Sequence, residues 1–400
     1  MYSIYRTSKK KFLRANQIFY LQHFRVKIPH YMNTQQFGVS PHKVNLPRQT
    51  LKKMIAVVHD LQNLCETPAY QNSLPNLAKT AQIEIHHHSV LMGYDFHITD
   101  THDVKLIEAN TNAGGLWFAS GINNASQKHL PNKLASKLIA TFINEYQLFT
   151  QDAQAKPKLV AIIDQHPSEQ FLYPEMRAFI QMFAQVGIGC IILDPSEIEF
   201  KNNIPTYNQQ RIDLIYNRHC DFYFNSVEMQ AIAKAWQAQS VCITPNPRVY
   251  GLLADKQRMV DWSQTELLNN LLPAKSALRL RQAIPSTQML SSLDQDTLWP
   301  QRKSLVFKPT NSYASRGVYI GKKLTKGKLA SLDPQTTLVQ EHIKPSITMT
   351  ADNTRFKTDF RLFVYRSTVL AICARIYQGQ VTNLRTPNGG FSQLTLTNTL

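Results

Sequence analysis

The sequence predicts an α/β (α+β) fold, and three observations lead to this prediction. Continuous apolar segments alternate with helical segments between residues 159 and 238, which is typical of a parallel sheet covered on both faces. A β-hairpin is indicated between residues 93 and 110. A strand, a turn of small residues and a second strand are indicated between residues 304 and 321. The length of 400 residues is sufficient for two or three domains.

Local patterns before residue 158 predict two helices and two irregular segments. Residues 1–50 are irregular in polarity and contain several prolines, so we expect an N-terminal arm or cover there. A helix is expected at about residues 51–65. Apolar residues recur with helical spacing over residues 132–146, which predicts a second helix. Residues 151–157 are expected to form a linker.

The hairpin carries three side chains with oxygen ligands. Asp95 lies on its first strand, and Glu108 and Asn110 lie two residues apart on its second strand, so the latter two share a face. Oxygen ligands on one face suit Mg²⁺ held against phosphates. Structural roles are the alternative, with Glu108 capping a turn and Asn110 fixing a bend. Asp100 and Asp103 are expected in the hairpin turn.

Further strands follow in the second half of the chain. Three apolar strands are expected to begin at about residues 159, 187 and 212, with helices at about 169–186 and 227–238. Lys308 ends a later apolar strand, and the turn that follows it contains serines and a glycine whose backbone N–H groups could approach phosphate. No Walker loop is present. Strands are also expected at 337–343, 357–366 and 370–390.

In their joint occurrence these segments resemble ATP-grasp ligases, the superfamily of D-alanine–D-alanine ligase, bacterial glutathione synthetase and the RimK-type glutamate ligases. The likeness covers roughly residues 85–120 and 155–395. The hairpin resembles the metal hairpin that closes the site in those enzymes, where it follows the other motifs. Here it precedes them, so the resemblance implies a circularly permuted ATP-grasp fold. Permutation is tolerated where chain ends lie close together.

The resemblance implies a division of the chain after the N-terminal arm. Residues 51–150 would be the permuted C-terminal part of the ATP-grasp domain, with the metal hairpin. Residues 155–250 would form the preATP-grasp domain, with its parallel sheet. Residues 251–400 would form the lid and the nucleotide-binding lobes, with Asp255 and Lys256 resembling the start of the lid helix.

The resemblance also implies ATP and Mg²⁺, or Mn²⁺, as cofactors, and a set of site residues. The implied metal ligands are Asp95, Glu108 and Asn110. The implied nucleotide-binding residues are Lys256, Lys308, Ser312, Ser315, Gly317, Gln340, Glu341 and Ile343. The implied catalytic residues are Arg375, Arg361 and Asn383, with Arg361 orienting the carboxylate substrate.

Structural alternatives stay open for several of these residues. Lys256 could be a surface lysine on a helix. Arg361 and Arg375 could form ordinary salt bridges, and Asp359 could hold an arginine in place. Asn383 could fix a loop. The run of three histidines at residues 86–88 is interpreted as structural, because consecutive residues on a strand alternate faces.

Composition limits the class of protein. The net charge of +17 favours anionic partners, although no specific nucleic-acid module is recognised. Five scattered cysteines without a C-x-x-C pair indicate neither a disulfide framework nor a zinc ribbon. No apolar run approaches the ~20 residues of a membrane span, and no signal peptide is recognised, so we expect a cytoplasmic protein without a membrane span.

The implied function is ATP-dependent ligation of a carboxylate to an amine through an acylphosphate. The expected partners are a small-molecule or peptide carboxylate, expected to be anionic, and an amine co-substrate; a homodimer is an open possibility. Two alternatives remain. One is a phosphotransferase (kinase) that uses the same ATP site, and the other is a non-catalytic protein that binds nucleotides or polyanions.

Overall fold

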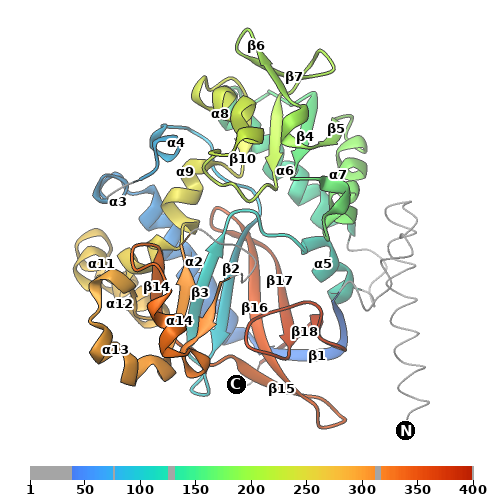
Figure 1. Ribbon diagram of the computed structural model, residues 1–400. Helices are drawn as coiled ribbons and strands as arrows, with labels where there is room; N and C mark the ends of the chain where they lie inside the picture. Colours follow the sequence, from blue (N-terminus) through green and yellow to red (C-terminus); the bar gives the residue numbers. More distant parts are fainter. Residues whose placement is uncertain (1–37, 75–76, 125–130, 311–316, 399–400) are drawn as a thin grey trace.

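The computed structural model describes residues 38–74, 77–124, 131–310 and 317–398, in which three sheets and their helices dominate (Figure 1). The main sheet has the strand order β1-β18-β17-β16-β2-β3, and β15 pairs with β16. β1 runs parallel to β18, and the other neighbours are antiparallel. Its strands are β1 (Val39–Pro47), β2 (Met92–Ile98), β3 (Val104–Asn110), β15 (Ser346–Met349), β16 (Arg355–Tyr365), β17 (Thr368–Tyr377) and β18 (Gly390–Thr397).

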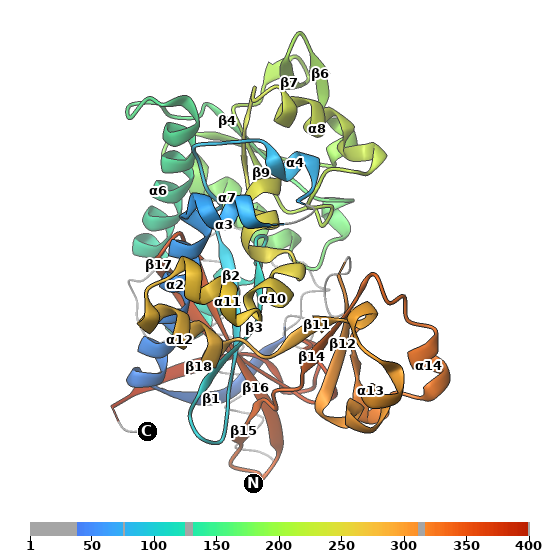
Figure 2. The ribbon, with the colours of Figure 1, turned by 90° about the vertical axis from the view of Figure 1, so that its left-hand side faces the viewer.

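The expected hairpin is confirmed as β2–β3, and it lies beside the late strand β16. Asp95 on β2 is directly opposite Arg361 on β16. The early and late strands are therefore neighbours in one sheet, as Figures 1 and 2 show. If the hairpin and the later motifs form one site, the hairpin must lie next to the strands that carry the arginines. The pairing of β2 with β16 places it there.

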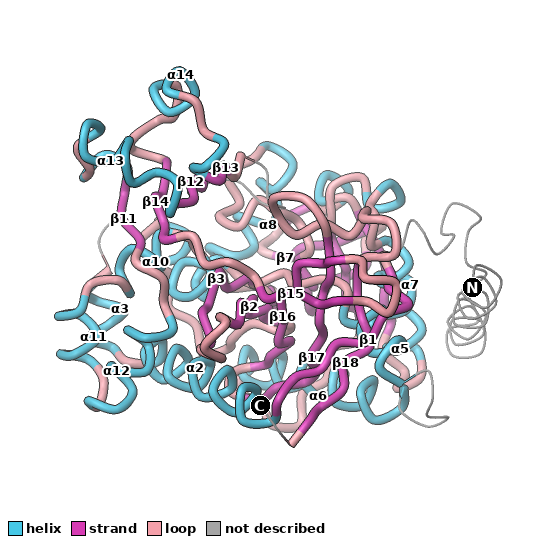
Figure 3. The backbone as a smooth tube through the Cα atoms, turned by 90° about the horizontal axis from the view of Figure 1, so that it is seen from below, coloured by secondary structure: helices cyan, strands magenta, loops and turns pink. Residues whose placement is uncertain are grey.

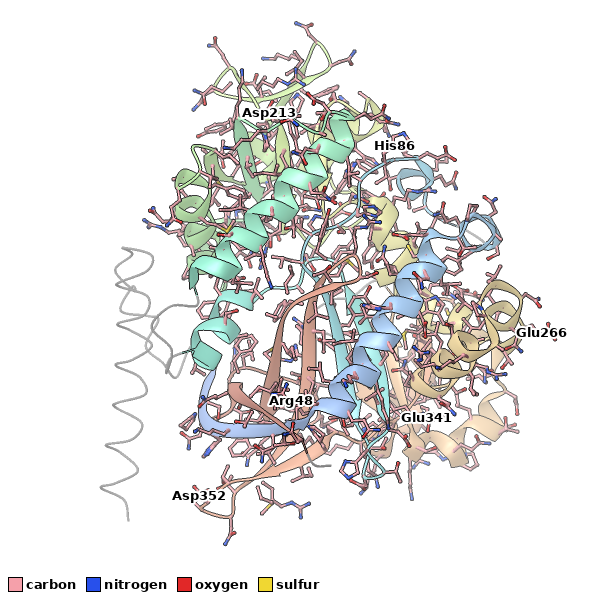
Figure 4. The ribbon with its side chains drawn as sticks, turned by 180° about the vertical axis from the view of Figure 1, so that it is seen from behind. Arg48, His86, Asp213, Glu266, Glu341 and Asp352 are labelled. Carbon is pink, nitrogen blue, oxygen red and sulfur yellow. The ribbon has the colours of Figure 1, made fainter. Side chains whose placement is uncertain are left out.

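Helix α2 (Arg48–Glu66) covers one face of the main sheet, as seen from behind in Figure 4 and from below in Figure 3. Its buried residues recur at helical spacing and pack with Tyr94, Phe96 and Leu362 of the sheet. The helix expected at residues 51–65 is confirmed, with an earlier start. The buried apolar residues of α2 are Met54, Val57, Val58, Leu61, Leu64 and Cys65.

The described end of the expected N-terminal arm belongs to the main sheet. β1 is an edge strand, and it contains two prolines, Pro41 and Pro47, which edge positions tolerate. Because proline is uncommon in strands, the sequence pattern does not indicate β1. Residues 1–37 lie outside the described part of the chain.

The second sheet has the order β10-β9-β4-β5 and is parallel throughout, which confirms the expected parallel sheet. Alternate residues of β4 enter two different cores: Val160 and Ile162 pack on one face, and Ala161 and Ile163 on the other. The strands therefore read as continuous apolar runs. The elements are β4 (Leu159–Ile163), β5 (Gly189–Leu193), β9 (Leu214–Asn217), β10 (Cys242–Thr244), α6 (Pro131–Thr150), α7 (Tyr173–Ala184) and α8 (Gln230–Gln237).

The third sheet forms a separate lobe at one side of the main sheet (Figure 2). Its order is β11-β14-β12-β13, and it is antiparallel with its own small core around Phe307 and Val339. The strands expected on either side of the turn after Lys308 are confirmed. The elements are β11 (Thr287–Met289), β12 (Leu305–Pro309), β13 (Tyr319–Ile320), β14 (Thr337–Glu341), α13 (Gln295–Gln301) and α14 (Lys326–Ala330).

Short elements connect these sheets. The helices are α3 (Pro68–Ser73), α4 (Lys79–Gln82), α5 (Leu116–Asn124), α9 (Pro247–Val249), α10 (Gln257–Trp262), α11 (Thr265–Leu271) and α12 (Ala274–Ala283), and a small sheet contains β6 (Glu199–Lys201), β7 (Ile204–Tyr207) and β8 (Gln210–Arg211). None of the helices in the described residues combines the length and the apolar character that crossing a membrane requires. The expected domain boundaries stay predictions, although the parallel sheet falls within residues 155–250.

Candidate functional site

Charged residues from four strands of the main sheet line one cleft, whose volume is about 1080 Å³. Asp95 on β2 is opposite both Glu108 on β3 and Arg361 on β16. Arg375 on β17 is opposite Asp359 on β16. Side chains directly opposite one another point to the same face of a sheet. Acids and bases of neighbouring strands therefore lie together on the face of the sheet that lines the cleft.

Asp95 holds both arginines. Arg361 donates to it through Nε and Nη2, each at 2.6 Å, and Nη2 of Arg375 lies 3.0 Å from its Oδ2. Asp359 accepts from Arg375 Nε at 2.6 Å and from the Thr382 hydroxyl. Burial alone would raise the pKa of Asp95, but the two guanidinium groups outweigh it and hold that pKa well below its usual range. Both oxygens of Asp95 are thus engaged with arginines.

The salt bridges considered as the structural alternative for these arginines are present, and Asp359 holds Arg375 in place, which was one of the roles considered for it. The catalytic roles of Arg361 and Arg375 stay predictions. Glu108 and Asn110 are less engaged. Asn110 Nδ2 donates to Glu108 Oε1 at 3.3 Å, and both side chains are half-buried at the cleft. Within the described residues no group of three or more His, Cys, Asp or Glu side chains could hold a metal ion. The assignment of Asp95, Glu108 and Asn110 to a metal stays a prediction.

Two lysines line the same cleft. Lys308 is the next-to-last residue of β12, and its Nζ donates to Gln340 Oε1 at 2.7 Å and to the Ile107 carbonyl at 3.4 Å. Burial lowers the pKa of Lys308 to about 8; Glu108 opposes this shift, and the positive charge of Lys256 adds to it. Burial also lowers the pKa of Lys256, again against Glu108. Two half-buried cations, of which Lys256 disfavours the charge of Lys308, fit a polyphosphate.

Lys256 precedes α10, so the expected helix start is confirmed. Asp255 Oδ1 accepts from the backbone N–H of Gln257 at 2.9 Å. The other oxygen of Asp255 accepts from the Tyr223 hydroxyl at 2.5 Å. Asp255 thereby fixes the backbone that presents Lys256 to the cleft.

The expected nucleotide-binding residues 340, 341 and 343 lie at the end of β14 and just beyond it. Gln340 is buried, and besides accepting from Lys308 it donates to Thr287 Oγ1 at 3.1 Å, so its side chain positions the lysine. Glu341 is exposed, and the Ile343 carbonyl faces Nδ1 of His97 at 2.9 Å. All three residues line the cleft. Their nucleotide-binding roles stay predictions.

The turn after Lys308 that was expected to approach phosphate is described only in part. Ser312 and Ser315 lie outside the described residues. Gly317 follows with a φ of +70°, and a Cβ there would lie 2.9 Å from Cγ of Pro309. This position therefore favours glycine for two reasons, the left-handed backbone and the close approach to Pro309.

Asn383 fixes the loop between β17 and β18, which was one of the roles considered for it. Its Nδ2 donates to the Gln378 carbonyl at 2.9 Å, and its Oδ1 accepts from the Thr386 hydroxyl at 2.9 Å and from the backbone N–H of Arg385 at 3.2 Å. Asn383 nevertheless lines the cleft, so a catalytic role stays a prediction.

The histidine run has structural partners in the described residues. His87 is buried, with Nε2 3.0 Å from the Ile243 carbonyl, and burial lowers its pKa to about 4. The backbone N–H of His88 donates to Glu145. These contacts agree with the structural interpretation, but residues 86–88 lie in an irregular segment and not on the strand from which that interpretation was argued.

The second end of the cleft was not predicted from the sequence. It is formed where β4 and β9 end, and its polar residues are Asp164, Arg218, His219, Asp221 and Glu228. A signal was present: Asp164 and Arg218 directly follow apolar strands of a parallel sheet, and ligands bind at the carboxyl ends of such strands.

Comparison with known proteins shows a likeness in fold to a solved structure. No model of a known protein family and no curated protein matches the sequence. A crystal structure from Methylobacillus flagellatus KT, provisionally assigned as a gamma-glutamylcysteine synthetase, matches with a TM-score of 0.51 and 9% identity. The match covers 92% of this chain and 89% of that one. At this identity the likeness concerns the fold alone, and it supports the mixed α/β architecture.

Proposed function

We propose that this protein is an ATP- and Mg²⁺-dependent ligase that joins a carboxylate to an amine through an acylphosphate. The proposal rests on one observation: Glu108 and Asn110 line the same cleft as Lys256 and Lys308, and Arg375 lies in it as well. Phosphoryl transfer from ATP requires oxygen ligands for Mg²⁺ and cationic side chains for the phosphates, and side chains of both kinds line this cleft. The provisional assignment of the similar crystal structure as a ligase agrees with this proposal.

The residues present fit the expected cofactor. Glu108 and Asn110 offer hard oxygen ligands, and they would hold Mg²⁺ together with phosphate oxygens. The ion would neutralise charge on the transferring phosphoryl group. Asp95 is held by two arginines and would contribute by anchoring the hairpin. It would be a metal ligand only if its oxygens contacted the ion in addition to the arginines.

The protein's own groups position the reactants. Lys256 and Lys308 bind the phosphates of ATP. The acid substrate attacks the γ-phosphate, ADP leaves, and the amine then displaces phosphate from the acylphosphate. Arg375 stabilises the charge that develops in both steps, because its guanidinium is fixed by two carboxylates and needs no reorganisation.

We further propose that the fold is a circularly permuted ATP-grasp fold. The pairing of β2 with β16 supports this proposal, since it brings the early hairpin beside the strand of Arg361. The cleft also contains the lysine of β12 and the strand end of β14, in the arrangement that the resemblance implies.

The test measures ADP and free phosphate with mixtures of carboxylates and amines. A ligase releases both only when acid and amine are present together. Glu108→Ala should lower kcat/KM about 100-fold or more, whereas Glu266→Ala, at an exposed position of α11 (labelled in Figure 4), should leave it unchanged. ADP with a stable phosphorylated product would indicate a phosphotransferase. Full activity of Glu108→Ala would refute the metal assignment.

A further inference from the structure

The lobe built on the third sheet carries a concentration of positive charge outside the cleft. Residues 297–332 contain eight Lys or Arg residues and no Asp or Glu, so this short segment has a charge of +8, almost half of the net charge of +17. Lys308 lines the cleft, and Arg316 lies outside the described residues. The other six, which we call the lobe cations, are Arg302, Lys303, Lys322, Lys323, Lys326 and Lys328.

A close backbone contact brings four of the lobe cations together. Two of them lie on the 3₁₀ helix η7 (Arg302–Ser304), and two lie on the 3₁₀ helix η8 (Gly321–Lys323). A Cβ at Gly321 would overlap the carbonyl oxygen of Arg302, so glycine is required where the two segments meet. Pairs of cations from separate parts of the chain therefore lie on adjacent turns.

Two aromatic rings hold other lobe cations in place. The guanidinium carbon of Arg302 lies 3.6 Å from the centre of the Trp299 ring, and Lys326 Nζ lies 5.7 Å from the same ring. Lys328 Nζ lies 4.8 Å from the centre of the Tyr319 ring. Contacts of this kind between cations and aromatic faces are attractive. Because η7 and α14 share one indole, the lobe cations form one surface, which we call the basic patch.

The charge of the basic patch is not neutralised within the protein. No ion pair joins a lobe cation to a carboxylate in the described residues. The residues outside the described part include no Asp or Glu. Two acids of the same lobe, Asp294 and Asp333, accept hydrogen bonds from nearby backbone N–H groups instead. Clustered like charges without counterions attract an external polyanion.

The side chains of the basic patch discriminate between classes of anionic partner. A peripheral membrane site combines cations with apolar side chains that enter the bilayer, and none of the exposed large apolar side chains of the described residues lies in this lobe. A surface for single-stranded nucleic acid combines cations for the phosphates with accessible aromatic rings. Trp299 and Tyr319 are half-buried, so part of each ring is accessible beside the lobe cations. The patch therefore fits a nucleic acid better than a lipid surface.

We propose that the basic patch binds a single strand of nucleic acid through its phosphates, without reading its sequence. The lobe cations contact successive phosphates, and the accessible parts of the two rings contact bases or sugars. None of these six cations lines the cleft, so the inference is independent of the proposed ligase. Figure 2 shows α14 on the side of this lobe that faces away from the main sheet.

The experiment measures fluorescence anisotropy of labelled single-stranded oligonucleotides with the full chain at several salt concentrations. Oligonucleotides of different sequence should bind with similar affinity. The logarithm of the binding constant should fall linearly with the logarithm of the salt concentration. About six phosphate contacts, each contributing about 0.7 for a single strand, predict a slope of about −4.

Two triple variants separate the patch from the net charge. Lys322→Gln/Lys323→Gln/Lys326→Gln removes three exposed lobe cations, and it should weaken binding about tenfold or more and make the salt slope shallower by about 2. Lys52→Gln/Lys234→Gln/Lys275→Gln removes three exposed lysines from α2, α8 and α12, so it changes the net charge equally. This control should bind like the wild type, and ADP release from ATP should be the same in both variants.

Each alternative gives a different result. If the wild type binds no oligonucleotide, or if the two triple variants lose affinity equally, the inference is overturned, and in the second case binding reflects net charge alone. Vesicles of phosphatidylcholine with phosphatidylglycerol, and polyglutamate, are measured in parallel. Tighter binding of either one through the same three lysines would assign the patch to a membrane or to an acidic protein and overturn the inference. A protein that binds oligonucleotides through the patch but releases no ADP would contradict the ligase proposal alone.

Discussion

Asp95 and Arg361 face each other across β2 and β16, joined by two hydrogen bonds of 2.6 Å although 266 residues separate them in the chain. Arg375 reaches the same carboxylate at 3.0 Å from β17. One buried acid therefore ties the early hairpin to two late strands. Because Glu108 is the other cross-strand neighbour of Asp95, this contact also places the expected metal ligand relative to both guanidinium groups.

The first prediction concerns the stability that this contact provides. Asp95→Asn removes a buried charge that the guanidinium groups of Arg361 and Arg375 share, so it should lower the free energy of unfolding by about 3–5 kcal/mol. Chemical denaturation measures the change. Asp100→Asn, at an exposed position in the turn of the same hairpin, should change it by no more than about 0.5 kcal/mol. Equal stabilities of the two variants would show that Asp95 does not anchor the hairpin.

The second prediction concerns nucleotide binding. Lys308→Met keeps the apolar stem of the side chain but removes the half-buried cation, and it should weaken ATP binding by about 2–3 kcal/mol, roughly 30- to 150-fold. Calorimetry with MgATP measures the affinity. Lys234→Met, at an exposed position on α8, provides the control. An unchanged affinity in Lys308→Met would place the phosphates elsewhere.

A third prediction follows from Glu145, a buried carboxyl on α6. It accepts from the Tyr365 hydroxyl at 2.8 Å and from the backbone N–H of His88 at 2.9 Å. Burial raises its pKa from 4.5 to about 7, although these hydrogen bonds oppose the shift. The native state then binds more protons than the unfolded state between these pH values. Stability should therefore fall by about 3 kcal/mol as pH rises through this window.

Urea denaturation at several pH values tests the role of Glu145. Glu145→Gln cannot titrate, so its free energy of unfolding should lose this downward slope whatever its stability at any one pH. Glu199→Gln, an exposed control, should keep the slope. Persistence of the slope in Glu145→Gln would assign it to another group.

Local patterns in the sequence were sufficient for much of the fold. Burial shapes the residue pattern within a single segment, as in the apolar runs of β4 and β9 and the helical spacing of α6. Such elements can therefore be predicted from the segment alone. The residues of β2 and β16 do not show by themselves that these two strands pair. Only the resemblance and the order of the motifs indicated this pairing. β1 was missed because its prolines contradict strand propensity, and β10 because it has only three residues.

The site was predictable to a similar degree. Residue types that bind metal and phosphate identified Glu108 and Lys308, and the cleft brings both together. The sequence could not show that Asp95 holds two arginines or that Gln340 holds Lys308, because both contacts depend on register between strands far apart in the chain. Arg218 was also missed, since its environment is assembled from Glu175, Tyr216 and Gly114.

The central claim is that the early hairpin and the lysines of the later segments serve one nucleotide. A crystal structure with Mg²⁺ and a non-hydrolysable ATP analogue tests it most directly. The predicted result is a metal ion on Glu108 and Asn110, bridged by phosphates to Lys256 and Lys308. A nucleotide bound outside the cleft, or one whose metal ion lies beyond the reach of Glu108, would contradict the account.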